Sequence, residues 1–331
     1  MPQRARRRIA VLGAGAWGTA LALQAARAGN AVSLWARNPD RAAAIVEAGE
    51  NARYLPGVPL SPAITVTADA AAALSEALFA LLVVPVQHLR EVVATLPDST
   101  CPLVVCAKGV ERGTLCLPLE ILHQSRPHTP AAVLSGPNFA HEVARGLPAA
   151  AVVASRDAGL RGLAADLLGT AGFRLYGGDD PMGVQVGGAA KNVIAIAAGA
   201  VIGAGLGENA RAALVTRGLA ELSRLTVALG GRAETAAGLS GLGDLLLTTT
   251  GPGSRNTSLG MELARGAPLE TVLAGRVGVA EGVETAPALV ARATKARIEL
   301  PICAAVADLL AGDLTIGEAM GRLLARPRRD E

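Results

Sequence analysis

The chain contains few aromatic residues and no concentrated charge. Phe, Trp and Tyr make up 2% of its 331 residues, and the formal net charge at pH 7 is only +3. A nucleic-acid-binding surface needs a basic face, often with aromatic side chains on which bases stack. Part of the basic excess lies at the two ends, in RARRR and RPRR, and not in one patch. These shortages argue against nucleic acid as a partner.

Cysteine and histidine are also scarce. The four cysteines form no CxxC pair, and no histidine lies at zinc-ligand spacing from them, so the sequence predicts no metal site. We expect the cysteines to be small core residues of a protein in a reducing compartment. The four histidines, His88, His123, His128 and His141, all lie in the first half of the chain. A histidine acid or base from the second half is therefore excluded.

The uncharged run 193–207 is shorter than the ~20 residues that a membrane-spanning helix needs, and it is rich in glycine. We expect a buried helix there and no membrane span. The N-terminal RARRR followed by IAVLGAGAWGTALALQAA has features of a secretory signal, yet the same residues fit a strand, a turn and a helix. We therefore expect a cytoplasmic protein.

Short apolar runs alternate with helix-length segments from residue 9 to about residue 155. The runs are IAVLG, VSLWAR, FALLVVP, PLVVCAKG, AAVLSGP and AAAVVAS. Unbroken runs of this kind indicate a parallel sheet covered by helices on both faces. After FRLYGG at 173–178, long Ala- and Leu-rich segments indicate helices. The sequence thus predicts an α/β protein, with an N-terminal doubly wound Rossmann-type parallel sheet over 1–180 and a C-terminal all-helical domain over 181–331.

A glycine-rich turn follows the first predicted strand. In RIAVLGAGAWGTALA, Gly13, Gly15 and Gly18 have G-x-G-x-x-G spacing and precede a helix. In a dinucleotide-binding turn the first glycine permits the sharp bend, the second lets backbone approach a pyrophosphate, and the third lets the helix close on the strand. The helix N-terminus also presents free N–H groups to the diphosphate. The segment predicts a dinucleotide cofactor, although a tight turn or another nucleotide-like ligand would fit the glycine spacing alone.

The second predicted strand carries the signal for the choice of cofactor. A site for NAD usually ends this strand with Asp or Glu, which binds the ribose hydroxyls. VSLWARNPDR instead has Arg37 there and Arg41 nearby, and a guanidinium suits a 2′-phosphate. We predict that NADP(H) is preferred and that NAD(H) is possible; the alternative is a solvated surface arginine. Trp17 either packs near the cofactor or fills a gap between helix and sheet.

Later predicted strands end in turn-forming segments, namely VVP at 83–85, CAKG at 106–109 and LSGP at 134–137. The carboxyl ends of the strands form the ligand crevice of an open α/β sheet, so Lys108, Gly136 and Asn138 should gather there. The simpler interpretation is that glycine and proline only turn the chain. It suits Lys108 less well, because a cation between two turn-forming segments is aimed at the crevice mouth.

Lys191 stands at the head of the apolar segment AAKNVIAIAAG. Burying an ammonium is costly unless it finds partners or loses its proton. Reduction of a carbonyl by a nicotinamide needs a proton for the developing alkoxide, and lysine is the remaining candidate in the second half. Burial lowers the pKa of a lysine, which suits it to act as the acid for reduction and the base for oxidation. The alternative is a lysine whose head reaches solvent from the helix end.

Two further segments add polar groups. In GLSGLGDLLLTTT, Asp244 follows a glycine-rich turn, where a carboxylate can bind substrate hydroxyls or orient the ammonium. GPGSRNTSLG offers Ser254, Arg255 and Asn256, with backbone N–H groups, ahead of a predicted helix. That set of donors suits a phosphate, although a plain loop with an N-cap would look much the same.

The motifs together resemble those of a known enzyme family. GAGAWGTALA, CAKG, LSGPNFA, AAKNVIAIAAG, GLSGLGDLLLTTTGPGSRN and VAEGVET follow the order and spacing of the bacterial-type NAD(P)-dependent glycerol-3-phosphate dehydrogenases. The resemblance covers nearly the whole chain, and its second-domain motifs are more specific than the glycine turn. It implies interconversion of sn-glycerol 3-phosphate and dihydroxyacetone phosphate, chiefly toward glycerol 3-phosphate for phospholipid synthesis, by a homodimer.

The resemblance also implies roles for individual residues, with Lys191 matching the acid/base lysine. The residues at substrate-binding positions are Lys108, Gly136, Asn138, Lys191, Asp244, Ser254, Arg255 and Asn256. Those expected at the cofactor, with the glycines of the turn, are Gly13, Gly15, Ala16, Trp17, Gly18, Arg37, Tyr54, Lys108, Gly136, Ala140, Arg255, Val279 and Glu281.

Two positions depart from the family pattern. Ala16 stands where serine is frequent, which removes a hydroxyl donor from the pyrophosphate turn, and Asn138 stands where serine or threonine is usual. Neither change removes the chemistry, since a backbone N–H at 16 remains and asparagine can still hydrogen-bond. Two alternatives stay open: a related two-domain reductase of a non-phosphorylated hydroxy acid, which has no use for GPGSRN, and a non-catalytic nucleotide sensor, which would bind NADPH without turnover.

Overall fold

The chain folds into two compact units, seen in a computed structural model that describes residues 7–276, 278 and 280–327. The first unit contains the chain up to Lys108 together with Leu117–Val184. The second contains Gly109–Cys116 together with the chain from Gln185 onward. The short segment 109–116 therefore belongs to the second unit, although its neighbours in sequence on both sides belong to the first.

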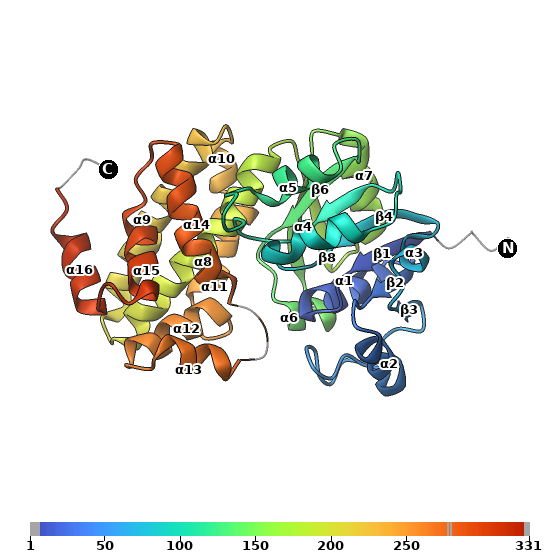
Figure 1. The fold of residues 1–331 in the computed structure, drawn as a ribbon, viewed down its shortest axis with the longest axis horizontal. Helices are drawn as coiled ribbons and strands as arrows, with labels where there is room; N and C mark the ends of the chain where they lie inside the picture. The colour runs from blue at the N-terminus through green and yellow to red at the C-terminus, as the bar shows by residue number, and fades with distance from the viewer. Residues whose placement is uncertain (1–6, 277, 279, 328–331) are drawn as a thin grey trace. The chain divides into compact units, whose positions relative to one another are not determined.

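The first unit is built on one sheet of eight strands within the described residues (Figure 1). The strands are β1 (Arg8–Leu12), β2 (Ala31–Trp35), β3 (Ile64–Thr67), β4 (Ala77–Leu82), β5 (Leu103–Val105), β6 (Ala131–Ser135), β7 (Ala149–Ala154) and β8 (Phe173–Gly178). Their order is β3-β2-β1-β4-β5-β6-β7-β8, and the part from β3 to β6 is parallel. This order confirms the doubly wound, Rossmann-type class.

The sheet differs from the predicted one in two respects: the direction of its last two strands, and the presence of β3, which was not among the predicted strands. β7 pairs antiparallel with β6, and β8 runs parallel to β7, so the last two strands reverse the direction of the sheet. An apolar run that is buried on both faces has the same pattern in either direction, so the sequence does not reveal this reversal. β3 at the sheet edge has no fully buried residue, and its sequence ITVT lacks the long apolar run of the other strands.

Helices pack on this sheet and complete the core of the first unit. They are α1 (Ala16–Arg27), α2 (Pro39–Ala48), α3 (Ala70–Leu74), α4 (Val86–Thr95), α5 (Pro118–Ser125), α6 (Ala140–Ala144) and α7 (Ala158–Leu168). Leu21 on α1, Val143 on α6 and Leu167 on α7 join the strands in one apolar cluster. α1 and α6 lie side by side (Figure 1), and α4 contacts α5.

Every regular element described after β8 is helical, as predicted. The elements are α8 (Pro181–Gly203), α9 (Gly207–Ala228), α10 (Ala233–Ala236), the π-helical turn η1 (Leu239–Gly243), α11 (Asp244–Thr249), α12 (Arg255–Ala264), α13 (Leu269–Ala274), α14 (Glu281–Lys295), α15 (Pro301–Ala311) and α16 (Ile316–Leu324). Apart from the first residues of α8, they belong to the second unit.

α8 forms the core of the second unit. Its residues 189–198 are all buried, and α12 packs closely against it: a Cβ on Gly260 would lie only 2.0 Å from the carbonyl O of Ile196. Glycine at this contact allows the two backbones to approach. By length and composition α8 could cross a membrane, but 78% of its apolar window is buried inside the protein, as in the core helix of a globular domain. The prediction of a buried helix over 193–207 is confirmed for 193–201, whereas α8 ends at Gly203 and residues 204, 205 and 207 are exposed.

Candidate active site

The glycine turn joins β1 to α1 at the carboxyl edge of the sheet. Gly13 has φ +125°, and a Cβ there would lie 2.3 Å from the carbonyl O of Val83, which follows β4. A Cβ on Gly18 would lie 1.8 Å from the carbonyl O of Gly13. Gly15 at the N-cap has no side chain to accept hydrogen bonds, so the first N–H groups of α1 can bind a ligand. Trp17, in the first turn of α1, packs against the apolar core.

The side chain of Asn51 stabilises this turn, although Asn51 lies far from it in the sequence. Its side chain is buried, and its Nδ2 donates to the carbonyl O of Ala14 at 3.0 Å and to Oγ1 of Thr19 at 2.8 Å. Thr19 Oγ1 in turn donates to the carbonyl O of Gly15 at 2.9 Å. Asn51 lies 37 residues from Ala14 in the sequence, so only the folded chain reveals the contact. Asn51 was not among the predicted site residues.

Arg37 follows β2, and its side chain extends into solvent. The side chain is 64% exposed and forms an ion pair with Glu91 at 3.6 Å. An exposed pair of this kind is weak, so an anionic ligand can displace it. Tyr54 lies near two further guanidinium groups, with Cζ of Arg41 5.3 Å and Cζ of Arg53 5.5 Å from its ring centroid. The chain after β2 therefore carries several cationic groups suited to a phosphate.

The ends of β5 and β6 bring Lys108 to Gly136. Nζ of Lys108 donates to the carbonyl O of Gly136 at 3.4 Å, and Gly136 has φ +152°. Asn138 donates from Nδ2 to the carbonyl O of Ala150 at 3.0 Å, whereas its Oδ1 is buried and has no hydrogen-bond partner among the described residues. A buried acceptor without a donor suits a ligand hydroxyl or amide. Ala140 begins the short helix α6 that follows.

Lys191 lies in the buried part of α8 and forms an ion pair with Asp244, the first residue of α11. Its Nζ is 2.9 Å from Oδ1 of Asp244 and 3.1 Å from Oγ1 of Thr248. The ammonium thus has two acceptors inside the unit, which offset the cost of burying its charge. The Lys191 side chain keeps 11% exposure, so a small ligand can reach it, whereas Asp244 is closed off at 1%. Thr248 was not among the predicted residues.

Asn192, the residue after Lys191, links three helices. Its Oδ1 accepts from Nδ2 of Asn256 on α12 at 2.9 Å, and its Nδ2 donates to Oε2 of Glu281 at the start of α14 at 3.2 Å. The backbone N–H of Gly282 donates to Oδ1 of Asn256 at 3.0 Å. These bonds hold Asn256 and Glu281 beside the turn of α8 that carries Lys191. In the sequence Asn192 shows only as a polar residue next to the lysine.

Ser254 and Arg255 open α12. Oγ of Ser254 accepts from the backbone N–H of Thr257 at 3.3 Å, so Ser254 is the N-cap, and its hydroxyl hydrogen can still be donated to a ligand. Thr257 donates from Oγ1 to the carbonyl O of Thr248, which ties the start of α12 to α11. The structure therefore gathers Lys191, Asp244, Asn256, Glu281 and the first turn of α12 in the second unit. Val279, also predicted at the cofactor, lies outside the described residues.

The four cysteines are buried and free of disulfides. Burial raises the pKa of Cys101 to about 11, and it also raises the pKa of Cys106 in spite of the neighbouring Lys108. Thiols with raised pKa values stay protonated at neutral pH and are poor nucleophiles and poor metal ligands. Within the described ranges no group of three or more His, Cys, Asp or Glu side chains could hold a metal ion.

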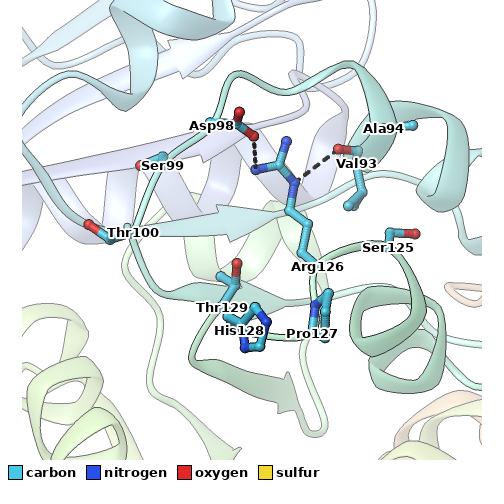
Figure 2. Close-up of a pocket in the computed structure, with 10 residues that line it drawn as sticks. All are labelled: Val93, Ala94, Asp98, Ser99, Thr100, Ser125, Arg126, Pro127, His128 and Thr129. Carbon is cyan, nitrogen blue, oxygen red and sulfur yellow. Dashed lines mark hydrogen bonds and ion pairs between the residues drawn. The ribbon is translucent and has the colours of Figure 1, made fainter.

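A polar hollow of about 810 Å³ lies at the amino ends of β5 and β6, away from the glycine turn (Figure 2). Arg126 extends along it, donating from Nε to the carbonyl O of Val93 at 3.2 Å and from Nη1 to that of Pro97 at 3.1 Å. The guanidinium thereby donates hydrogen bonds to carbonyl groups at the end of α4. None of the predicted site residues lines the hollow.

The fold, with the glycine turn at the carboxyl edge of its sheet, is that of a dinucleotide-dependent oxidoreductase. The family description "NAD-dependent glycerol-3-phosphate dehydrogenase" matches the chain in two parts, the N-terminus over residues 8–160 and the C-terminus over residues 180–321. The chain belongs to this family of glycerol-3-phosphate dehydrogenases.

Curated relatives and solved structures agree with this membership. The glycerol-3-phosphate dehydrogenases (NAD(P)+) of Caulobacter vibrioides and Acidiphilium cryptum are 51% and 54% identical to the chain over 327 and 323 residues, and each match covers 98% of both chains. The crystal structure of glycerol-3-phosphate dehydrogenase from Coxiella burnetii is 38% identical, covers 97% of this chain and 99% of that one, and superposes with a TM-score of 0.93. The predicted family and fold class are confirmed.

Proposed function

We infer that this chain catalyses the reversible reduction of dihydroxyacetone phosphate to sn-glycerol 3-phosphate with NAD(P)H and so supplies glycerol 3-phosphate for glycerophospholipid synthesis. Curated relatives that match it over nearly their whole length are glycerol-3-phosphate dehydrogenases. The structural observation that carries the inference is the buried Lys191 with its two acceptors, because carbonyl reduction needs a positioned proton donor.

The glycine turn fits a dinucleotide. At Gly13 and Gly18 a Cβ would collide with backbone, and the open N-terminus of α1 can bind a pyrophosphate. When bound, a reduced nicotinamide supplies the hydride for the reaction. We assign the remaining cofactor contacts to the positions that match the family pattern, namely Ala16, Trp17, Arg37, Tyr54, Lys108, Gly136, Ala140, Arg255, Val279 and Glu281.

Lys191 transfers the proton. As the carbonyl carbon of the substrate gains a hydride, the C=O electron pair moves to the oxygen, which takes a proton from the Lys191 ammonium and leaves a neutral amine. In the oxidation direction the neutral amine removes the hydroxyl proton. Asp244 and Thr248 accept hydrogen bonds from the ammonium and fix its direction, so the proton is held at one place before transfer.

The first turn of α12 binds the substrate phosphate in this proposal. Arg255 offers a planar guanidinium that matches phosphate oxygens, and Ser254 and Asn256 add a hydroxyl and an amide. Lys108 and Asn138, with the backbone of Gly136, bind the polar atoms of the three-carbon chain, for which the unpaired Oδ1 of Asn138 serves as an acceptor.

Several finer features belong to the same proposal. NADPH is preferred over NADH because Arg37 follows β2 where an acidic residue would bind the ribose of NAD. Residues 1–180 form the dinucleotide-binding domain, and residues 181–331 form the helical substrate and catalytic domain, which carries Lys191 and adds contacts to the cofactor. The enzyme acts in the cytoplasm as a homodimer, as the family resemblance implies.

The test is a turnover assay with matched substrates. Purified protein is mixed with NADPH and dihydroxyacetone phosphate, and the loss of reduced-nicotinamide absorbance is followed, with NADH in a parallel reaction. Rapid loss with NADPH and slower loss with NADH is the expected result. Dihydroxyacetone without its phosphate is the control and should react far more slowly. Equal rates with and without the phosphate would favour a reductase of non-phosphorylated substrates. Binding of NADPH with no turnover would favour a non-catalytic nucleotide sensor.

A further inference from the structure

Arg276 lies in the loop after α13, and its side chain binds to α12. Its Nη1 donates to the carbonyl O of Arg255 at 2.7 Å and to Oγ of Ser258 at 2.9 Å. Its Nη2 pairs with Oε1 of Glu262 at 2.5 Å. The side chain is only 14% exposed, so one guanidinium is buried against a single helix. Three acceptors from the first two turns of α12 thus hold it in one orientation.

Two residues further on, the same loop touches the guanidinium of Arg255. Gly278 has φ +100°, and a Cβ at this position would lie 2.3 Å from Nη1 of Arg255. The backbone at Gly278 therefore lies directly against the Arg255 side chain, in a conformation that favours glycine. Arg276 and Gly278 thus contact the same residue of α12 from positions two residues apart in the sequence. Arg255 is held at its main chain by Arg276 and at its side chain by Gly278.

One nitrogen of the Arg276 guanidinium takes no part in these bonds. Its Nε is buried and has no hydrogen-bond partner among the described residues. A buried donor left unpaired is unfavourable, so the bonds made by Nη1 and Nη2 hold Arg276 in this position.

We propose that Arg276 is a positioning residue that orients the Arg255 guanidinium for the phosphate of the substrate. The proposal rests on the proposed function, which assigns Arg255 to that phosphate. A free arginine side chain loses much rotational freedom when it binds in a bidentate geometry. A guanidinium that is already confined on one side by Gly278, on a main chain bonded to Arg276, loses less on binding, so the phosphate is bound more tightly.

A double-mutant cycle tests the proposal. The variants are Arg276→Ala, Arg255→Ala and the two combined. Arg276→Ala should raise KM for dihydroxyacetone phosphate roughly 10- to 100-fold, with kcat changed much less, because the lost contact is to a non-reacting group. In the Arg255→Ala background, Arg276→Ala should change KM hardly at all, since the residue it orients is gone. With unphosphorylated dihydroxyacetone, Arg276→Ala and the wild type should have equal kcat/KM.

Gly278→Ala perturbs the same feature without removing a charge. Its new methyl group collides with Nη1 of Arg255, so KM should again rise in the wild type and stay unchanged in the Arg255→Ala background. Arg276→Lys keeps a charge but cannot reach three acceptors and should give an intermediate KM. These two variants keep the test decisive where Arg276→Ala fails to fold. Arg322→Ala is the matched control, because it removes another ion-paired arginine of the second unit, bound to Asp308, and should leave KM unchanged.

A binding measurement separates this proposal from the proposed function. Calorimetric titration of sn-glycerol 3-phosphate into the complex with NADPH measures phosphate affinity without turnover, because both ligands are in the reduced state. A protein that binds glycerol 3-phosphate but never reduces dihydroxyacetone phosphate would contradict the proposed function and still report on Arg276. Additive effects of the two alanine substitutions, or an equal loss with unphosphorylated dihydroxyacetone, would overturn the positioning role.

Discussion

Replacing Lys191 by methionine should destabilise the protein as well as stop catalysis. Methionine fills much of the space of the lysine stem, but it leaves the carboxylate of Asp244 without the ammonium that lies 2.9 Å from it. Asp244 is 1% exposed, so water cannot replace the lost partner. Breaking one side of a buried ion pair costs about 3–5 kcal/mol, and we expect the free energy of unfolding of Lys191→Met to fall by about this amount.

A second substitution separates stability from catalysis. Asp244→Asn removes the stranded charge with almost no change of shape and keeps the contact with Oγ1 of Thr248 at 3.4 Å. The double variant Lys191→Met/Asp244→Asn should therefore recover most of the lost free energy of unfolding. Its kcat should stay roughly 10²- to 10⁴-fold below that of the wild type, because no proton donor has been restored.

The assays are urea unfolding for stability and oxidation of NADPH by dihydroxyacetone phosphate for turnover. The dissociation constant of NADPH, measured by fluorescence, serves as the control and should be unchanged in both variants. A double variant no more stable than Lys191→Met would show that the stability lost in Lys191→Met does not come from breaking the ion pair with the Asp244 carboxylate. Near-normal turnover in either variant would refute the role of Lys191 as the proton donor.

Three further predictions concern other parts of the chain. Arg37→Ala should raise KM for NADPH by roughly 10-fold and leave KM for NADH nearly unchanged, because only NADPH carries the 2′-phosphate; equal effects on both would remove the assigned role. Asn51→Ala should cost about 1–3 kcal/mol of stability and weaken NADPH binding, whereas Asn30→Ala, which removes another buried asparagine bonded to backbone carbonyls, should cost similar stability and leave NADPH binding intact. Burial raises the pKa of Glu221, so its contribution to stability is present below its unfolded pKa and is lost as pH rises through the folded value. The free energy of unfolding of Glu221→Gln relative to the wild type should therefore increase in urea titrations as pH rises above about 4.3, the unfolded pKa of glutamate, and a constant difference would contradict this.

The sequence predicts the features that depend on neighbouring residues. The strand, glycine turn and helix from residue 8 to residue 27 form one local pattern, and the contact that requires glycine at position 18 is with Gly13 in the same turn. α8 is likewise visible as an apolar run of helical length that contains one charge. Such elements follow from periodicity and from the conformations that glycine permits.

The features that the sequence does not predict depend on contacts between distant segments. Asn51 and Asn192 are ordinary polar residues until folding brings Ala14 to the first and Asn256 to the second. The role of Arg276 is likewise visible only in the folded chain, where its side chain bonds to the carbonyl group of Arg255 on α12. The direction of β7 is hidden for a related reason, because a buried apolar run gives the same pattern in parallel and antiparallel pairs.

The role of Lys191 as the proton donor is tested most directly by a single-turnover experiment on the wild type and on Lys191→Met. Enzyme in excess over NADPH is mixed rapidly with saturating dihydroxyacetone phosphate, and absorbance of the reduced nicotinamide is recorded, so that the chemical step is seen apart from product release. We expect complete oxidation of NADPH by the wild type in one fast phase, and a phase roughly 10²- to 10⁴-fold slower in the variant. Equal rates in the two proteins would contradict it.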